Sequence, residues 1–392
     1  MNSIIIPVSV GEAIDKQTIL EIKIERITSG NEYVLKEHSL ISEQINHFIT
    51  EDAIFHKNIL KAINVQIWDL QDEFRNKQDS KVQSAICEKI IQLNDARFRI
   101  KNKLDNLLSS TLKEQKGYKK QKAFFLGHLG LGDQINCIPI VRYLATLFDS
   151  ITVVCKKKHL TNLKLIYRDD YTINFYPVES DEFISPQYGF PIDEFNRVTS
   201  GFEVFTCGLH NQRYSMFQKA EWDEHFSDLP FCFYRDLEFS PSIYYSHHHI
   251  ASSQESDAMY DLVKGFEYIV MQSSTSEGSL INPNEATQYL NIDPNKTLLI
   301  DINQNLYAQD HIWHAIAETF INKPLPFYKK TLINAQKLIL TDSSLFCMAI
   351  ALPLECVKFY YKSRNNHDYS YIFQFLSQQK NKISYSFLKY KP

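Results

Sequence analysis

Residues 123–144, AFFLGHLGLGDQINCIPIVRYL, hold the pattern from which the fold of this chain can be derived. The apolar run 123–126 predicts a short buried strand, and three glycines within six residues follow it. Apolar residues then recur at helical spacing, which predicts a helix over 134–147. Strand, glycine turn and helix together form the opening unit of a nucleotide-binding α/β domain. Glycine lets a ligand approach the backbone closely, and a helix start offers free N–H groups to an anion.

Asp133 directly follows the last of these glycines. At the mouth of the crevice above the strand, a carboxylate can act as a general base. Aspartate is also a common N-cap, so Asp133 can equally serve to cap the 134–147 helix. Both interpretations stay open from the sequence.

Length and composition describe an ordinary globular protein. The chain has 392 residues, 44% of them hydrophobic and 22% charged, which predicts two or three domains. A net charge of −4 gives no basic surplus for nucleic acid. No stretch approaches the ~18 apolar residues of a membrane span, and the N-terminus lacks the basic segment of a signal peptide. The seven cysteines are scattered without C-x-x-C pairs, so we expect reduced thiols in a cytoplasmic protein.

Residues 1–120 are predicted to form a mainly helical module. A short strand over 4–10 is followed by a helical pattern in AIDKQTILEIKIERI. From His38 to about Gln121, apolar stripes predict two to four helices packed as an antiparallel bundle or hairpin. Polar breaks near Thr50 and Lys77 separate them. Such helices can simply stabilise the protein or make it a homo-oligomer.

After about residue 120 the pattern changes to α/β alternation, and we expect a first Rossmann-like domain over 121–265 and a second over 266–392. The first has predicted strands at 123–126, 151–155, 172–178 and 201–206, with helices near 134–147, 212–225 and 252–264. The second has predicted strands at 268–272, 297–301, 337–340 and 355–360, with helices at 284–289, 311–320, 327–335, 345–351 and 368–378. Each domain places a small-residue loop where a strand ends and a helix begins, so two such loops facing each other predict an interdomain cleft.

Other nucleotide and metal sites fit the sequence poorly. The glycine spacing is G-x-x-G-x-G, Lys156–Lys158 stands where a dinucleotide fold needs an acid, and no G-K-[ST] is present. His247, His248 and His249 are adjacent, a spacing that does not converge on one metal. Asp169-Asp170 is interpreted as a solvated turn. Lys156–Lys158 is interpreted as a solvated strand end, with an anionic acceptor or lipid headgroup as the alternative.

The first 120 residues resemble a family of small bacterial proteins that look like companions of surface-polysaccharide genes. The resemblance lies in IIIPVSVGEAIDKQTILEIKIERI, INVQIWDLQDEFR and LNDARFRIKNKLDNLLSS. It implies no particular activity.

The rest of the chain resembles glycosyltransferases of the two-Rossmann (GT-B) type, especially the heptosyltransferase-like group. That group has an "LGD…..P….L" segment after its first strand. Residues 131–133 match its LGD, and Pro139 and Leu144 follow at the same spacing. Its C-terminal "A..i..DSG..H.A..l..P" is matched by AQKLILTDSSLFCMA at 335–349, with Leu352 and Pro353 following. Ser344 replaces the second glycine and Cys347 the histidine. Where the group has an "S…K.W" loop, this chain has only Ser273-Ser274-Thr275-Ser276, without the lysine and tryptophan.

The resemblance implies a GT-B-like fold and transfer of a sugar from a nucleotide-sugar donor to a glycan or lipid-linked acceptor, with no metal or other cofactor. It implies that Asp133 is the general base. The loop residues implied on the acceptor side are His128, Gly130, Gly132 and Gln134. Those implied on the donor side are Gln272, Ser273, Ser274, Asp342, Ser343, Ser344 and Arg364.

The donor-side residues also have structural alternatives. Asp342 can cap the 345–351 helix, and Arg364 can form a surface ion pair. The second hypothesis for the whole chain is a non-catalytic binding or assembly protein that keeps the fold. The first hypothesis places the enzyme in the cytoplasm, with peripheral contact to the inner membrane as an option.

Overall fold

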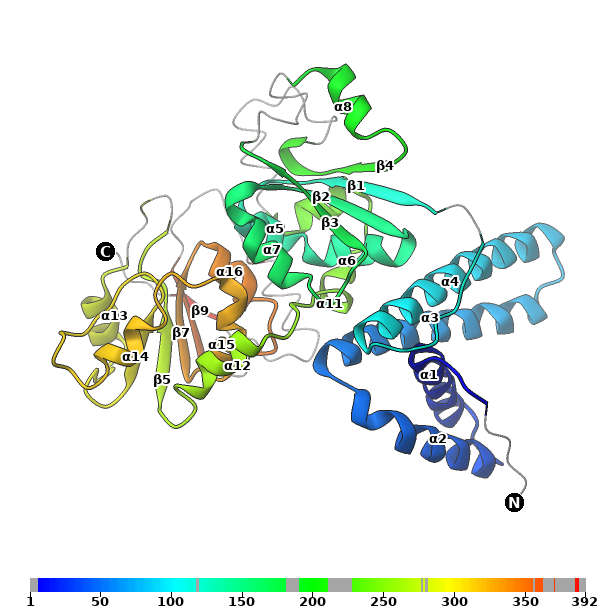
Figure 1. The fold of residues 1–392 in the computed structure, drawn as a ribbon, viewed down its shortest axis with the longest axis horizontal. Helices are drawn as coiled ribbons and strands as arrows, with labels where there is room; N and C mark the ends of the chain where they lie inside the picture. The colour runs from blue at the N-terminus through cyan, green and yellow to red at the C-terminus, as the bar shows by residue number, and fades with distance from the viewer. Residues whose placement is uncertain are drawn as a thin grey trace.

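The computed structural model describes residues 6–117, 120–180, 190–210, 228–275, 278, 281–354, 357–361, 370 and 385–387. The predicted helices at 212–225 and 368–378 lie outside these residues, except for residue 370, and so does Arg364. The chain begins with a helical region and continues into two parallel sheets, each with helices around it (Figure 1). This arrangement confirms the predicted fold class.

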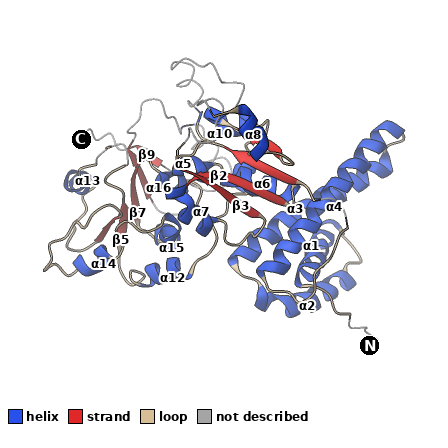
Figure 2. Cartoon of the chain, turned by 45° about the horizontal axis from the view of Figure 1, so that its top comes forward, coloured by secondary structure: helices blue, strands red, loops and turns tan. Residues whose placement is uncertain are grey.

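Four helices make up the N-terminal region: α1 Val10–Arg26, α2 Glu32–Ile45, α3 Glu51–Asn76 and α4 Ser80–Leu107. The polar breaks act as helix starts, since Thr50 accepts a hydrogen bond from the Ala53 N–H and Asp79 accepts from Lys81 and Val82. The long helices α3 and α4 lie side by side as a hairpin that extends beyond the rest of the protein (Figures 1 and 2). The helical prediction is therefore confirmed.

The predicted strand over 4–10 is wrong in its described part. Residues 6–9 are not in a sheet, and Val10 is the first residue of α1. Pro7 has no backbone N–H to give to a strand neighbour, and the Ser9 hydroxyl accepts from the Glu12 N–H at 3.1 Å. The segment is thus the entry to a helix.

The first sheet contains four parallel strands in the order β3-β2-β1-β4. They are β1 Lys122–Leu126, β2 Ser150–Lys156, β3 Ile173–Val178 and β4 Glu203–Thr206. The strand order reverses between β1 and β4, which is where a ligand crevice opens in such sheets.

The helix predicted at 134–147 is two helices, α5 Leu131–Asn136 and α6 Ile138–Leu147. Pro139 explains the division, because it lacks an N–H and fits the first turn of a new helix. The other helices that the structure describes in this unit are η2 Lys157–His159, α7 Leu160–Ile166, α8 Ile192–Val198, η5 Gly208–His210, α10 Phe231–Asp236 and α11 Ile243–Ser246.

The second sheet is parallel with the order β6-β5-β7-β8-β9. Its strands are β5 Tyr268–Met271, β6 Leu298–Asp301, β7 Lys337–Thr341, β8 Val357–Tyr361 and β9 Tyr385–Phe387. Its described helices are α12 Gln254–Asp261, α13 Pro283–Tyr289, α14 His314–Glu318, η8 Leu325–Tyr328, α15 Lys329–Ile333 and α16 Ser344–Ala349. The helix near 252–264 was predicted for the first domain, but α12 packs against α15 and η8 of this unit. Here the order reverses between β5 and β7.

Buried side chains of both sheet units form one continuous apolar cluster, while the helical region has a core of its own. The two α/β units therefore pack directly against each other, notably α5 against α16. No helix in the described part of the chain is long and apolar enough to cross a membrane.

Candidate functional site

The glycine turn after β1 holds Asp133 close to His128. Gly130 is the N-cap of α5, so Asp133 lies in the first helical turn and its predicted capping role is wrong. The Asp133 Oδ2 lies 3.4 Å from the His128 Nδ1, and a Cβ on Gly130 would come within 2.8 Å of the same oxygen. The carboxylate therefore folds back over the turn, in space that only glycine leaves open. The Gln134 side chain donates to the His128 carbonyl at 2.5 Å and fixes the turn.

The end of β4 and the residues after it pack against the same glycine turn. Gly208 has φ +62°, and a Cβ there would collide with the His128 Nε2. The Gly208 N–H donates to Asp236 at 2.7 Å, and buried His210 lies beside them, its ring 6.4 Å from that of His128. Asp236 and His210 were not predicted, because their place beside β1 depends on how distant segments fold together.

Two of the predicted donor-side residues, Gln272 and Ser343, contact each other where the second sheet reverses. Gln272 and Ser273 follow β5, and Asp342 and Ser343 follow β7. The Ser343 hydroxyl donates to the Gln272 side chain and accepts from the Phe346 N–H at 3.1 Å. Ser343 is thus the N-cap of α16, so the capping role suggested for Asp342 belongs to its neighbour.

Asp301, at the end of β6, is a third member of this site that the sequence interpretation missed. Its Oδ1 accepts from the Ser273 N–H at 3.3 Å and from the Asn303 N–H at 3.0 Å. Burial raises the pKa of Asp301 despite these hydrogen bonds. The signal was present: an acid ends the apolar run TLLID, where a parallel strand points its last side chains into the crevice.

The two loops meet at Gly132. A Cβ on Gly132 would lie 3.3 Å from the Cys347 Sγ and 3.6 Å from the Ser344 Cα. The Asn136 side chain lies 3.5 Å from the same sulfur. Cys347, at the position of the group's histidine, therefore acts as a packing residue between α5 and α16. The ends of β1 and β7 are brought together as the sequence predicted.

Asp169 and Asp170, expected in a solvated turn, are buried, so that prediction is wrong. Asp169 accepts two hydrogen bonds from the Arg142 guanidinium, at 2.7 and 3.0 Å, and lies 3.1 Å from the His56 Nε2. Burial alone would raise the pKa of Asp169, but Arg142 and His56 outweigh it and hold this pKa well below its usual range. Asp170 accepts from Lys103 of α4 at 2.6 Å. The acids join the helical region to the first sheet.

The lysine run 156–158 and the histidine run 247–249 behave as surface or packing residues. Lys157 is exposed and pairs with Glu179. In the described ranges, no group of three or more histidine, cysteine, aspartate or glutamate side chains is arranged to hold a metal ion. His247, His248 and His249 instead line a cavity described below.

Residues 4–124 match the model of a family described as "Family of unknown function (DUF6165)", so the helical region is a DUF6165 domain. No curated protein matches the sequence.

Solved structures show a low-identity likeness. TibC, an iron-containing dodecameric glycosyltransferase from enterotoxigenic E. coli, has a TM-score of 0.38 and 15% identity over 66% of this chain, a match that spans only 63% of TibC. A glycosyl transferase family 9 protein from Veillonella parvula has a TM-score of 0.42 and 12% identity over 71% of this chain and 90% of its own. The E. coli heptosyltransferase WaaC, solved with ADP, has a TM-score of 0.32 and 10% identity, over 66% of this chain and 98% of WaaC.

Proposed function

We propose that the protein is a glycosyltransferase that moves a sugar from a nucleotide-sugar to a glycan or lipid-linked acceptor in bacterial surface polysaccharide synthesis. One observation carries the proposal: the Asp133 loop and the Ser343-Ser344 loop, each at the reversal point of a parallel sheet, lie against each other through Gly132. Sheets of this kind bind their ligands at that point.

On the acceptor side, Asp133 is the proposed base. A hydroxyl that attacks the sugar must lose its proton, and a carboxylate within hydrogen-bond distance accepts it. His128, 3.4 Å away, orients this carboxylate, which lies over Gly130 in space that a side chain would fill. Gln134 holds the loop.

On the donor side, the nucleotide is proposed to lie over the reversal between β5 and β7. Ser273, Ser274, Ser343 and Ser344 offer hydroxyl and N–H groups there, with Gln272 and Asp342 beneath them. Arg364 remains a predicted partner of the diphosphate, since its planar guanidinium suits phosphate oxygens. No metal or cofactor is assigned. The proposed enzyme works in the cytoplasm, with its helical domain available for contacts between copies.

A second candidate is a binding or assembly protein without catalysis. The contact of Gly132 and Asn136 with Cys347 favours it, because a sulfur packed against the glycine turn occupies the position where the related group carries a histidine. The two candidates differ in whether a sugar is transferred, and only the first requires a nucleotide at the β5–β7 reversal.

The test is a thermal-shift screen of the full chain against nucleoside diphosphates, including ADP, and CMP. A ligand that binds only the native state raises the melting temperature. At a ligand concentration of a hundred times Kd, it adds about 2.7 kcal/mol to the free energy of unfolding. Ser343→Ala should abolish the shift. Ser253→Ala is the matched control, because Ser253 is likewise the N-cap of a helix, α12, away from the site. A panel without any shift, or an equal shift in both variants, would contradict the donor site.

A further inference from the structure

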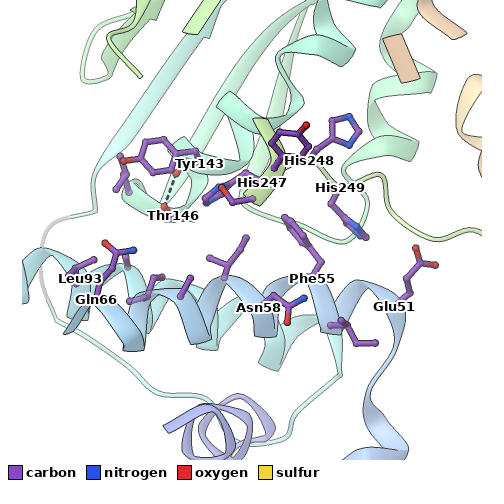
Figure 3. Close-up of a pocket in the computed structure, with 18 residues that line it drawn as sticks. Glu51, Phe55, Asn58, Gln66, Leu93, Tyr143, Thr146, His247, His248 and His249 are labelled. Carbon is purple, nitrogen blue, oxygen red and sulfur yellow. Dashed lines mark hydrogen bonds between the residues drawn. The ribbon is translucent and has the colours of Figure 1, made fainter. Parts of the chain in front are cut away.

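A cavity of about 540 Å³ lies between the helical domain and the first sheet unit (Figure 3). Helix α3 forms one long wall, and α6 and residues 245–249 form the other. Its volume is within the range of small-molecule sites. It is separate from the Asp133 and Ser343 loops, because neither loop contributes a lining residue.

The α3 wall is a single helix face. Its lining residues run from Glu51 to Gln66 at intervals of three and four. Fifteen steps along a helix span about 22 Å, so 540 Å³ is spread over a long and narrow space. Glu51 and His249 lie at one end of it, and Gln66 and Leu93 at the other (Figure 3).

Aliphatic side chains form a continuous part of this lining, beside the polar side chains of Asn58, Thr146 and Ser246. Ile54, Ile59, Ala62 and Ile63 come from α3, and Leu147 from α6. Ile54 is 47% exposed and Leu147 36%, although each faces the cavity. Both side chains therefore show apolar surface to solvent that an occupant would cover.

The lining carries almost no usable charge. Glu51 is the only acid among the residues that line the cavity, and Lys329 neutralises it. Burial lowers the pKa of His247 to about 4 and that of His248 to about 3, so both imidazoles are neutral near pH 7. A charged ligand would enter without a counter-charge, at a high desolvation cost.

We propose that this cavity binds the single aliphatic chain of an uncharged amphiphile. Where Ile54, Ile59, Ile63 and Leu147 line the cavity, a sugar or nucleoside would leave hydroxyl and ring nitrogen groups unpaired, whereas an aliphatic chain loses only contact with water. The proposal does not depend on the glycosyltransferase function, since it concerns another part of the molecule.

Calorimetric titration of the full chain with octyl, decyl and dodecyl maltoside, each below its micelle concentration, tests the chemistry. We expect affinity to rise about two- to fourfold for each added methylene, with a negative heat capacity change. Maltose alone should not bind. Affinity that is independent of chain length, equal binding of maltose, or no binding of any of the maltosides would overturn the proposal.

Two variants test the location. Ala62→Trp, at an exposed position on the cavity face of α3, should fill the space and weaken dodecyl maltoside binding at least tenfold. Ala85→Trp is the matched control, since it places the same side chain at an exposed alanine of α4 that does not line the cavity. Ile54→Glu, also exposed, adds a negative charge to the wall and should weaken binding as well, so a folding defect in Ala62→Trp leaves the test intact. Unchanged binding in a folded cavity variant would place the ligand elsewhere.

Discussion

Glu51 at the start of α3 and Lys329 in α15 form an ion pair that connects the DUF6165 domain to the second sheet unit. The Lys329 ammonium also donates to the Ile250 carbonyl at 2.8 Å, and Ser252 donates to Glu51 at 2.9 Å. Asp52 accepts from the Ser252 N–H at 2.9 Å. The start of α3 thus holds residues 249–252, the segment that leads from the first sheet unit into the second.

Glu51→Gln should loosen this segment. Burial would raise the pKa of Glu51, but Lys329 outweighs it and lowers this pKa, so the carboxylate stays charged beside the ammonium. Because the Glu51 side chain is half exposed, the loss of stability should be at most about 1 kcal/mol. Amide hydrogen exchange in 249–252 should become faster. Glu88→Gln, at an exposed position on α4, is the control, and equal exchange in the two variants would refute the connection.

Asp169→Asn should strongly destabilise the folded protein. It leaves the buried Arg142 guanidinium without its counter-charge, a change that costs about 3–5 kcal/mol. Asp72→Asn, which breaks the exposed pair with Arg75, should change stability by less than about 0.5 kcal/mol. Denaturant unfolding of both variants measures the difference. A mild effect at Asp169 would show that the network contributes little.

Gly132→Ala should be destabilising because its methyl group would press on Cys347. A Cβ at 3.3 Å from the sulfur requires a displacement of the packed Cys347, and we expect this overpacking, about 1–3 kcal/mol, to exceed the roughly 1 kcal/mol that alanine gains over glycine in a helix. Adding Cys347→Ala should restore part of the loss, so the double variant is more stable than additivity predicts. Gly265→Ala, with nothing within 4 Å, is the neutral control. Strict additivity would argue against direct contact of α5 and α16.

Asp133→Asn separates catalysis from stability. The loss of a first-turn carboxylate costs a few tenths to about 1 kcal/mol. If Asp133 is the base, transfer should fall about 10²- to 10⁴-fold while nucleotide affinity changes little. Asp193→Asn, in the first turn of α8, is the matched control. Rates are measured with the sugar donor whose nucleotide raises the melting temperature, and a stable, fully active Asp133→Asn protein would end the assignment.

Acidification from pH 7 toward pH 4 should destabilise the protein. His247 has a folded pKa of about 4 because burial disfavours its charged form, whereas the unfolded chain takes up this proton near pH 6.5. The unfolded state therefore binds more protons over this window, and stability falls as pH falls, by up to about 3 kcal/mol from this group. His247→Gln should flatten the pH profile of the melting temperature between these values. An unchanged profile would mean that the ring titrates freely.

Periodicity predicted β1 to β8, because each is a short run rich in apolar residues, but it missed β9 Tyr385–Phe387 at the edge of the second sheet. It also predicted that the Gly132 and Ser343 loops would face each other, since both follow strands that point into one crevice. Arg364 and the proposed domain boundaries stay predictions. The division of the 134–147 helix could have been foreseen from Pro139.

What the sequence could not reveal are contacts between distant segments. Asp169 and Asp170 look like a polar turn until Arg142, His56 and Lys103 are placed around them, and those partners lie 27 to 113 residues away. The same holds for Asp236, whose partner Gly208 lies 28 residues earlier. Burial of a charge is a property of the folded neighbourhood, which periodicity does not encode.

The Lys103–Asp170 pair also affects how the chain is made. Lys103 leaves the ribosome 67 residues before its partner. At the usual speed of synthesis, about 5–20 residues per second, roughly 3–13 s pass between the synthesis of Lys103 and that of Asp170, which neutralises its ammonium. During this interval the side of α4 that will face the first sheet stays exposed to solvent. The nascent helical domain therefore offers chaperones a transient surface that the finished protein no longer has.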